Sequence, residues 1–356
     1  MRKFPLCIAS RRRFLKAAGA FGAVAAMPRR GWAAEEDKQL NVYNWDTYIG
    51  GTTLQTYTDR TGTTVQYDLF ANNEELLAKL KEGNPGYDVI FPGDYMVESM
   101  ISLGILMPLD HAKLGNIGNV DPTFADPGYD PGMKHSVPYK WGTVGIGYRK
   151  SKVETPDSWS LLFDSDRYAG RLALLADQRI VLGCALKYLG YSMNSTSQDE
   201  IDKARDLLIR QKPHIKAFAP DEGQNMLVGG DVDIVMEWNG DINQVMSEDS
   251  DLSYVTPKEG TNVFVDNMCI PKDAPHPENA HAFIDHILDP QVEAEICNTI
   301  HYATPNAAAR KLLPAAELSN ATIYPPNEVI AKSEPILDVG DFTTAYDRAW
   351  TEVQAA

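Results

Sequence analysis

Apolar and polar positions follow two alternating periods along the first part of the chain. Runs typical of strands occupy residues 40–45, 63–70 and 87–92, and segments with helical spacing follow them at residues 52–60, 74–83 and 94–104. Thr52 and Thr53 stand where they can cap the first helix, Asn72 and Asn73 where they can cap the second, and Gly104 ends the third. This alternation predicts an α/β fold with a mostly parallel sheet, whose ligand sites lie at the carboxyl ends of the strands.

The segment at residues 136–150 interrupts this rhythm with a proline and three glycines around a strand-like run. It predicts a first crossing into a second domain, and the run at residues 261–271 predicts the return. Several crossings with few flexible residues between them suit a hinge that closes on a ligand. We expect lobe 1 to comprise residues 34–141 and 267–306, and lobe 2 to comprise residues 142–266 and 307–356.

The N-terminal segment has the features of an export signal. Residues 1–33 carry eight basic residues and no acid, and "SRRRFLK" at residues 10–16 resembles the twin-arginine consensus. A weak apolar stretch follows at residues 17–27, and Gly31 and Ala33 form a small-x-small cleavage site. We therefore expect a twin-arginine signal peptide over residues 1–33 and a mature protein in the periplasm.

Loss of this leader changes the charge of the protein. The whole chain has a net charge of −16, but without the eight basic residues 25 Lys and Arg remain against 49 Asp and Glu, a net charge of about −24. Such a chain repels nucleic-acid phosphates and attracts cations. The three cysteines beyond the leader, Cys184, Cys269 and Cys297, show no CxxC spacing, so one disulfide is possible and a metal site is not expected.

Motifs for nucleotide, metal or nucleophilic chemistry are absent from the sequence. We find no GxxxxGK[ST], HExxH or GxSxG, and the glycines at residues 142–147 are not followed by the helix that a dinucleotide site needs. The sequence therefore predicts no cofactor and no metal, and it favours a binding protein over an enzyme.

Aromatic residues recur beside acids near the predicted strand ends. The instances are Trp45 and Asp46 with Tyr48, Asp94 with Tyr95, Trp238 with Asp241, and Phe264 with Asp266. An ammonium group over an aromatic face gains ~0.5 to 2 kcal/mol, and a nearby carboxylate compensates its desolvation through a charge-assisted hydrogen bond. Each pair alone is explained by core packing or helix capping, but four pairs favour a shared site for a cation.

The order of motifs along the chain resembles a known family. It runs "YNW..YI", "NNEELLAKLKEG", "YDVIFP..Y", "VPYKWGTVGIGY", "W.GD", "F.D...IPK", "YATPN.AA" and "IYPP..V", and it is similar to the periplasmic polyamine-binding proteins of bacterial ABC transporters. The resemblance implies a two-lobed periplasmic binding protein (type II) fold, a monomer, and a membrane permease as partner. It also implies an aromatic box of Trp45, Tyr48, Tyr95, Trp238, Phe264 and Tyr302, with acids at Asp177, Asp241 and Asp266.

The chain departs from the family at four ligand positions. Thr47 stands where the family has an acid, which is displaced to Asp46, and Gly93 replaces a serine. Ile180 replaces a glutamate, and Ile336 replaces the glutamine of spermidine binders. Polar anchors for a second amino group are therefore missing or moved.

Several ligands and functions stay open on this basis. A diamine such as putrescine would use Asp241 and Asp266 at one end and Asp46 or Asp177 at the other, whereas a zwitterion such as 4-aminobutyrate would need Arg179. An exported amine-acting enzyme with Asp241 or Asp177 as general base is the rival from another class. A chemoreceptor-coupled sensor would use the same binding fold.

Overall fold

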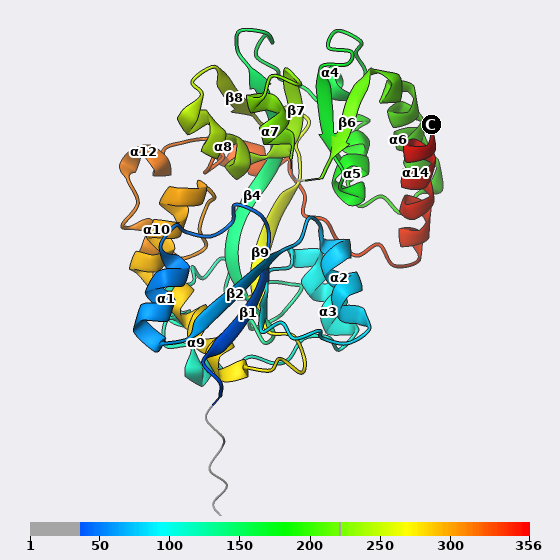
Figure 1. Cartoon of the computed structure of the whole chain (residues 1–356). Coiled ribbons are helices and arrows are strands. Elements are labelled where there is room, and N and C mark those ends of the chain that lie inside the picture. Colours follow the sequence, from blue (N-terminus) through cyan, green and yellow to red (C-terminus); the bar gives the residue numbers. More distant parts are fainter. Residues whose placement is uncertain (1–35, 221) are drawn as a thin grey trace, which may run out of the picture. The chain divides into compact units, whose positions relative to one another are not determined.

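The computed structural model describes residues 36–220 and 222–356. The signal peptide predicted at residues 1–33 lies outside the described residues. Residues Glu36–Ala356 form one compact α/β unit. Its sheet of nine strands has the order β2-β1-β3-β9-β4-β7-β5-β6, with β8 paired to β4 (Figure 1).

The elements of the described residues have the following bounds. The strands are β1 (Gln39–Asn44), β2 (Thr64–Leu69), β3 (Val89–Ile90), β4 (Ser136–Arg149), β5 (Leu172–Leu175), β6 (Ile215–Ala219), β7 (Ile234–Trp238), β8 (Leu252–Val255) and β9 (Val263–Cys269). The helices are α1 (Thr53–Thr61), α2 (Asn73–Lys81), α3 (Asp94–Ser102), α4 (Ser160–Phe163), α5 (Gln178–Tyr188), α6 (Gln198–Gln211), α7 (Gly223–Val228), α8 (Asn239–Glu248), α9 (Pro277–Ile287), α10 (Pro290–Ile300), α11 (Ala307–Arg310), α12 (Ala315–Leu318), α13 (Asn327–Ile330) and α14 (Thr343–Ala355). Short 3-10 turns are η1 (His111–Lys113), η2 (Ile117–Asn119), η3 (Lys212–His214) and η4 (Gly340–Phe342).

The prediction of a mostly parallel sheet is wrong for its middle. β1 pairs in parallel with β2 and β3, and β5 pairs in parallel with β6 and β7. In contrast, β4 is antiparallel to β7, β8 and β9, and β9 is antiparallel to β3. One of the two central strands leaves the first half of the sheet and the other returns to it, so they run in opposite directions.

Strand β4 joins the two halves of the sheet. Its first part, from Ser136 to Thr143, pairs with β9, and its second part, from Val144 to Arg149, pairs with β7 and β8. The glycines of the predicted crossing lie inside this strand, where Gly142 allows close approach: a Cβ atom there would stand 2.3 Å from Asn239 Oδ1. In Figure 1 β4 and β9 continue from the lower half, which contains β1, β2 and β3, to the upper half, which contains β5, β6, β7 and β8.

Separate hydrophobic cores support the two halves. The core of the upper half gathers residues of β5, β7, α5, α6 and α14 around the fully buried Trp159. In the lower half, one core packs α1, α9 and α10 on one face of the sheet, and a further core packs α2 and α3 on the other (Figure 1). Each half therefore has its own rigid support for the loops that follow its strands.

The helix starts show which capping predictions hold. Asn72 Oδ1 accepts a hydrogen bond from the backbone N–H of Glu75 at 2.8 Å, which confirms it as the cap of α2. Thr52 makes no such side-chain bond to α1.

The pair Phe264 and Asp266 lies within β9 rather than at a strand end, so that part of the strand-end prediction is wrong.

The three cysteines are buried free thiols, with no disulfide between them. In the described part of the chain, no helix has both the length and the apolar character to cross a membrane.

Candidate functional site

A cavity lies where the two halves of the sheet meet, with about 550 Å³ of empty space that includes its opening to solvent. All ten residues predicted to contact a ligand line it: Trp45, Asp46, Tyr48, Tyr95, Asp177, Trp238, Asp241, Phe264, Asp266 and Tyr302. Six further residues line the cavity: Gly93, Ile180 and Ile336, which stand at the family's ligand positions, and Asn73, Asp94 and Asn262, which the sequence does not predict as contacts.

The topology explains why residues so distant in sequence share one cavity. Trp45 follows β1, and Tyr95 lies in the first turn of α3, just after β3. From the other half, Asp177 follows β5 and Trp238 ends β7. The carboxyl ends of these parallel strands face the crossing strands, and β9 contributes its own side chains between them.

Edge-to-face aromatic contacts hold the rings of the cavity in place. The rings of Trp238 and Phe264 have centroids 5.0 Å apart at 81°, and those of Tyr48 and Tyr302 are 4.9 Å apart at 89°. Phe264 also contacts Tyr302, with 6.2 Å between centroids. The indole N–H of Trp45 donates to Phe91 O at 2.8 Å. The cavity thus presents aromatic walls of fixed orientation, suited to apolar chains and to cations.

Asp266 is a buried carboxylate held by a tyrosine. Its Oδ2 accepts a hydrogen bond of 2.7 Å from Tyr48 Oη, and the residue is only 7% exposed. Burial, reinforced by the negative charge of Asp266, raises the pKa of Tyr48 well above its usual range, so the phenol remains a donor. Tyr139 Oη in turn donates to Tyr48 O at 2.7 Å. This chain fixes the position of the Asp266 carboxylate in the wall.

Asp94 is a second buried carboxylate in the cavity wall. The sequence predicts its pairing with Tyr95 but not its contact with the cavity. It begins α3, and its Oδ1 accepts a hydrogen bond from Tyr95 N at 2.8 Å. Burial raises the pKa of Asp94 to about 7. Near neutral pH this carboxyl group is therefore partly protonated, and a nearby cation would favour its ionised form.

Acids from both halves also approach one another near Tyr95. Asp177 caps α5, since its Oδ1 accepts from Ile180 N at 2.9 Å, and burial raises its pKa. From the lower half, Glu74 accepts a hydrogen bond of 3.1 Å from Tyr95 Oη. Loss of hydration and then repulsion by Asp177 raise the pKa of Glu74 to about 7, although its side chain reaches the surface. A cation placed here would relieve this repulsion.

Asp241 lies in the first turn of α8 and is 5% exposed. Gln244 Nε2 donates to Asp241 Oδ1 at 3.3 Å and to Ile300 O at 3.1 Å, which ties α8 to the segment before Tyr302. At the preceding Gly240, a Cβ atom would stand 2.1 Å from the Tyr302 ring, so this close approach requires glycine.

Asp46 and Arg179 are placed differently from the other charged candidates. Asp46 is exposed, and its Oδ1 accepts the N–H of the next residue, Thr47, at 2.8 Å, so it belongs to the rim of the cavity. Arg179 donates to Asn194 Oδ1 and Leu337 O, its guanidinium lies 4.5 Å from the centre of the Tyr346 ring, and it is not part of the cavity lining. No Lys or Arg of the described residues lines the cavity.

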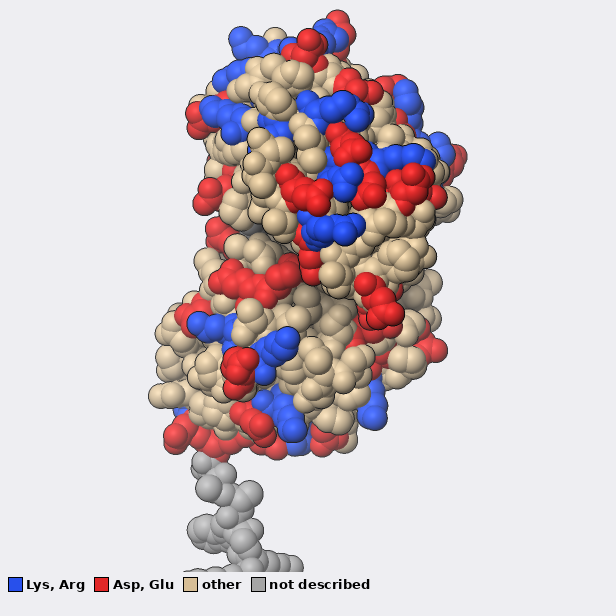
Figure 2. All heavy atoms as spheres, turned by 90° about the vertical axis from the view of Figure 1, so that its right-hand side faces the viewer, with Lys and Arg blue, Asp and Glu red and all other residues tan. Residues whose placement is uncertain are grey.

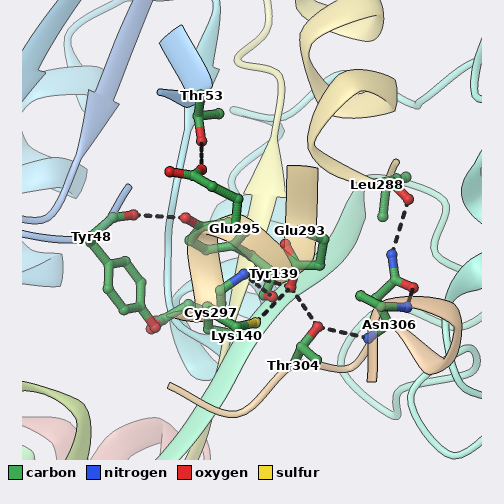
Figure 3. A network of polar contacts seen from close by, with 12 residues as sticks. Tyr48, Thr53, Tyr139, Lys140, Leu288, Glu293, Glu295, Cys297, Thr304 and Asn306 are labelled. Atoms are coloured by element: carbon green, nitrogen blue, oxygen red, sulfur yellow. Dashed lines mark hydrogen bonds and ion pairs between the residues drawn. The ribbon is translucent and has the colours of Figure 1, made fainter. Parts of the chain in front are cut away.

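A buried ion pair lies behind this wall (Figure 3). Lys140 Nζ on β4 contacts Glu293 Oε1 on α10 at 2.5 Å, and both residues are almost completely buried. Thr304 Oγ1 donates to the same Glu293 oxygen and accepts the N–H of Asn306 at 3.0 Å. The network therefore anchors the segment that carries Tyr302 to β4 and α10.

Acidic side chains also gather on the surface between the two halves. Figure 2 shows acidic side chains gathered at the indented waist between the upper and lower halves on the face in view. Together with the carboxylates of the lining, this charge favours entry of a cation over that of an anion.

The pH dependence of stability tests the buried Asp94. Its pKa of about 7 lies above the ~3.9 of an unfolded aspartate, so the native state binds an extra proton between these values. The free energy of unfolding should therefore fall as the pH rises through this window. Between pH 4.5 and pH 8 the free energy of unfolding of Asp94→Asn should fall by a few kcal/mol less than that of the wild-type protein. Urea denaturation without ligand measures this difference. Parallel pH profiles for the two proteins would contradict the burial argument.

An α/β chain whose two halves enclose a cavity between crossing strands has the architecture of a two-lobed binding protein. Comparison with known structures agrees: a putative spermidine/putrescine ABC transporter protein from Listeria monocytogenes superimposes with a TM-score of 0.85 at 34% identity, over 89% of this chain and 99% of that one. The chain belongs to the bacterial extracellular solute-binding proteins, whose family model matches residues 52–326.

Two curated relatives match nearly the full length. The spermidine/putrescine-binding periplasmic protein of Salmonella typhimurium is 36% identical, over 96% of this chain and 98% of its own length. The putrescine-binding periplasmic protein PotF of Escherichia coli is 34% identical, over 95% of this chain and 96% of its own length.

Proposed function

We propose that the protein captures a polyamine or diamine in the periplasm and delivers it to the membrane permease of an ABC transporter. The observation that carries the proposal is the composition of the cavity, where aromatic walls and buried carboxylates converge and no Lys or Arg of the described residues takes part. A carboxylate compensates the desolvation of an ammonium group, and aromatic faces cover the methylenes between amino groups at ~0.8 kcal/mol each. The names of the curated relatives support the same ligand class.

The same cavity argues against the zwitterionic alternative. A ligand such as 4-aminobutyrate brings a carboxylate that needs a cationic partner, and Arg179 contacts Asn194, Leu337 and Tyr346 instead of lining the cavity. Burying that carboxylate beside Asp177 or Asp266 would add repulsion to its desolvation cost. We therefore propose diamines and polyamines, rather than amino acids, as the ligands of this cavity.

Capture in this proposal is a change of conformation without covalent chemistry. The lobe boundaries at residues 141–142 and 266–267 fall on β4 and β9, and we place the hinge there. Closure would bring Trp238 and Asp177 of one lobe against Trp45 and Tyr95 of the other. We further propose export by the predicted leader and a monomeric mature protein, because one chain supplies the whole lining.

A thermal-shift screen tests the proposed ligand class. We expect putrescine, cadaverine, spermidine or agmatine to stabilise the mature protein, by ~2.7 kcal/mol when the ligand is present at 100 times its dissociation constant. 4-Aminobutyrate serves as the matched control, since it has one amino group and a carboxylate. Stabilisation by the zwitterion alone would reject the proposal, and product formation from any amine would reassign the protein to the enzymes.

A further inference from the structure

Asn262 carries a buried acceptor with no hydrogen-bond partner in the cavity wall. The residue directly precedes β9, lines the cavity and is 1% exposed. Its Nδ2 donates to Val263 O at 3.4 Å and to Glu334 O at 3.3 Å, which fixes the orientation of the amide. Its Oδ1 has no partner among the residues that the structure describes. A buried acceptor of this kind is costly unless something donates to it, so its position in a binding cavity points to a ligand N–H.

The position of Asn262 on the strand sets the length of that ligand. Asn262, Phe264 and Asp266 alternate along one extended segment, and all three line the cavity. Side chains two residues apart project to the same face, and each residue advances the strand by ~3.3 Å. Asn262 and Asp266 therefore mark the two ends of a row of ~13 Å, with the Phe264 ring between them.

The surroundings of Asn262 differ from those of Asp266. Ile180 and Ile336 are apolar neighbours in the lining, and both belong to the core of the upper half. Ile336 is near α5, since a Cβ atom at Gly183 would lie 3.6 Å from its Cδ1. Asn262 is bridged to Glu334, two residues before Ile336, so its neutral acceptor belongs to the apolar end of the lining.

On the basis of the function proposed above, we propose that Asn262 Oδ1 accepts a hydrogen bond from an amino group of the ligand and selects a long polyamine of the triamine class, such as spermidine. One amino group binds at Asp266, the methylenes lie along Phe264, and an amino group at the far end reaches Asn262. A four-carbon diamine bound at Asp266 is too short to reach both ends of the row. Its affinity is therefore independent of Asn262.

Calorimetric titration of wild-type protein and Asn262→Leu with spermidine and putrescine tests this proposal. We expect the leucine variant to bind spermidine about tenfold or more weakly, since a lost hydrogen bond to a charged donor removes at least one factor of ten. Putrescine affinity should stay within about twofold, which also shows that the cavity of the variant is intact. Asn262→Ala gives the same comparison if leucine does not fit.

The possible outcomes separate the two proposals. Equal losses for both amines, or no loss for spermidine, would overturn the role of Asn262 while leaving amine capture in place. A wild-type protein that binds neither amine would overturn the proposed function and the role of Asn262 with it.

Discussion

Replacing Asp266 with asparagine is expected to weaken putrescine binding by about 30-fold to more than a thousandfold. Removing one member of a buried charge pair costs about 2–5 kcal/mol, and each 1.4 kcal/mol is a factor of ten. The substitution preserves an oxygen that can accept from Tyr48 Oη, so the wall stays in place while the charge is lost. Isothermal titration calorimetry of the purified variant measures the effect.

Asp46→Asn is the matched control for Asp266→Asn. It removes the same charge from an exposed residue at the rim of the same cavity. Exposed charge pairs contribute only about 0–1 kcal/mol, so we expect a change of at most about fivefold. A large loss in the Asp46 variant with none in the Asp266 variant would transfer the ammonium site to the rim and contradict our assignment.

Replacing Glu293 with alanine is expected to destabilise the protein by about 3–5 kcal/mol, because it leaves the Lys140 ammonium buried without its partner. Lys140 is fully buried, and its Nζ has a second acceptor only at 3.4 Å, in Tyr139 O. Thr304 loses its acceptor in the same variant. Urea denaturation without ligand gives the change in the free energy of unfolding.

Two further variants show whether charge is the cause. Glu295→Ala removes a neighbouring acid on α10 that accepts from Thr52 N, Thr53 Oγ1 and Thr299 Oγ1 near the surface, and it should cost about 0.5–1.5 kcal/mol. The double variant Lys140→Met with Glu293→Leu removes both charges and should be more stable than Glu293→Ala alone. If the single and double variants were equally unstable, lost packing would be the cause.

Much of the candidate site was predictable because many of its residues belong to a local sequence pattern. Trp45, Tyr95 and Trp238 stand near acids just after apolar strands, and parallel strands bring their carboxyl ends to one edge. The family resemblance supplied Asp177 and Tyr302, for which the local pattern carries no signal.

The residues missed in the sequence have roles that depend on three-dimensional surroundings. In the sequence, Asn262 is only a polar residue before a strand. In the structure, the hydrogen bonds of its Nδ2 fix the amide, and its Oδ1 is left without a partner. Asp94 was noticed beside Tyr95, but its depth in the wall follows from packing against β9. Asp46 shows the converse case: its sequence neighbours favour a ligand contact, and the local bond to Thr47 keeps it at the rim.

The antiparallel centre of the sheet was not predicted, because strand pairing also depends on contacts between residues far apart in the sequence. The run at residues 136–150 gives the position of a crossing, but its periodicity contains no information on which strand it pairs with. Pairing with β9, more than a hundred residues later, reverses the local direction of the sheet. Long-range strand order therefore required the structure.

The most direct test of the central claim is a crystal structure of the mature protein with spermidine. We predict one amine between the lobes, with a nitrogen within hydrogen-bond distance of Asp266 and its methylenes against Trp45, Trp238 and Phe264. An amine bound outside this cavity, or a cavity that closes on a ligand without an ammonium group, would contradict the account.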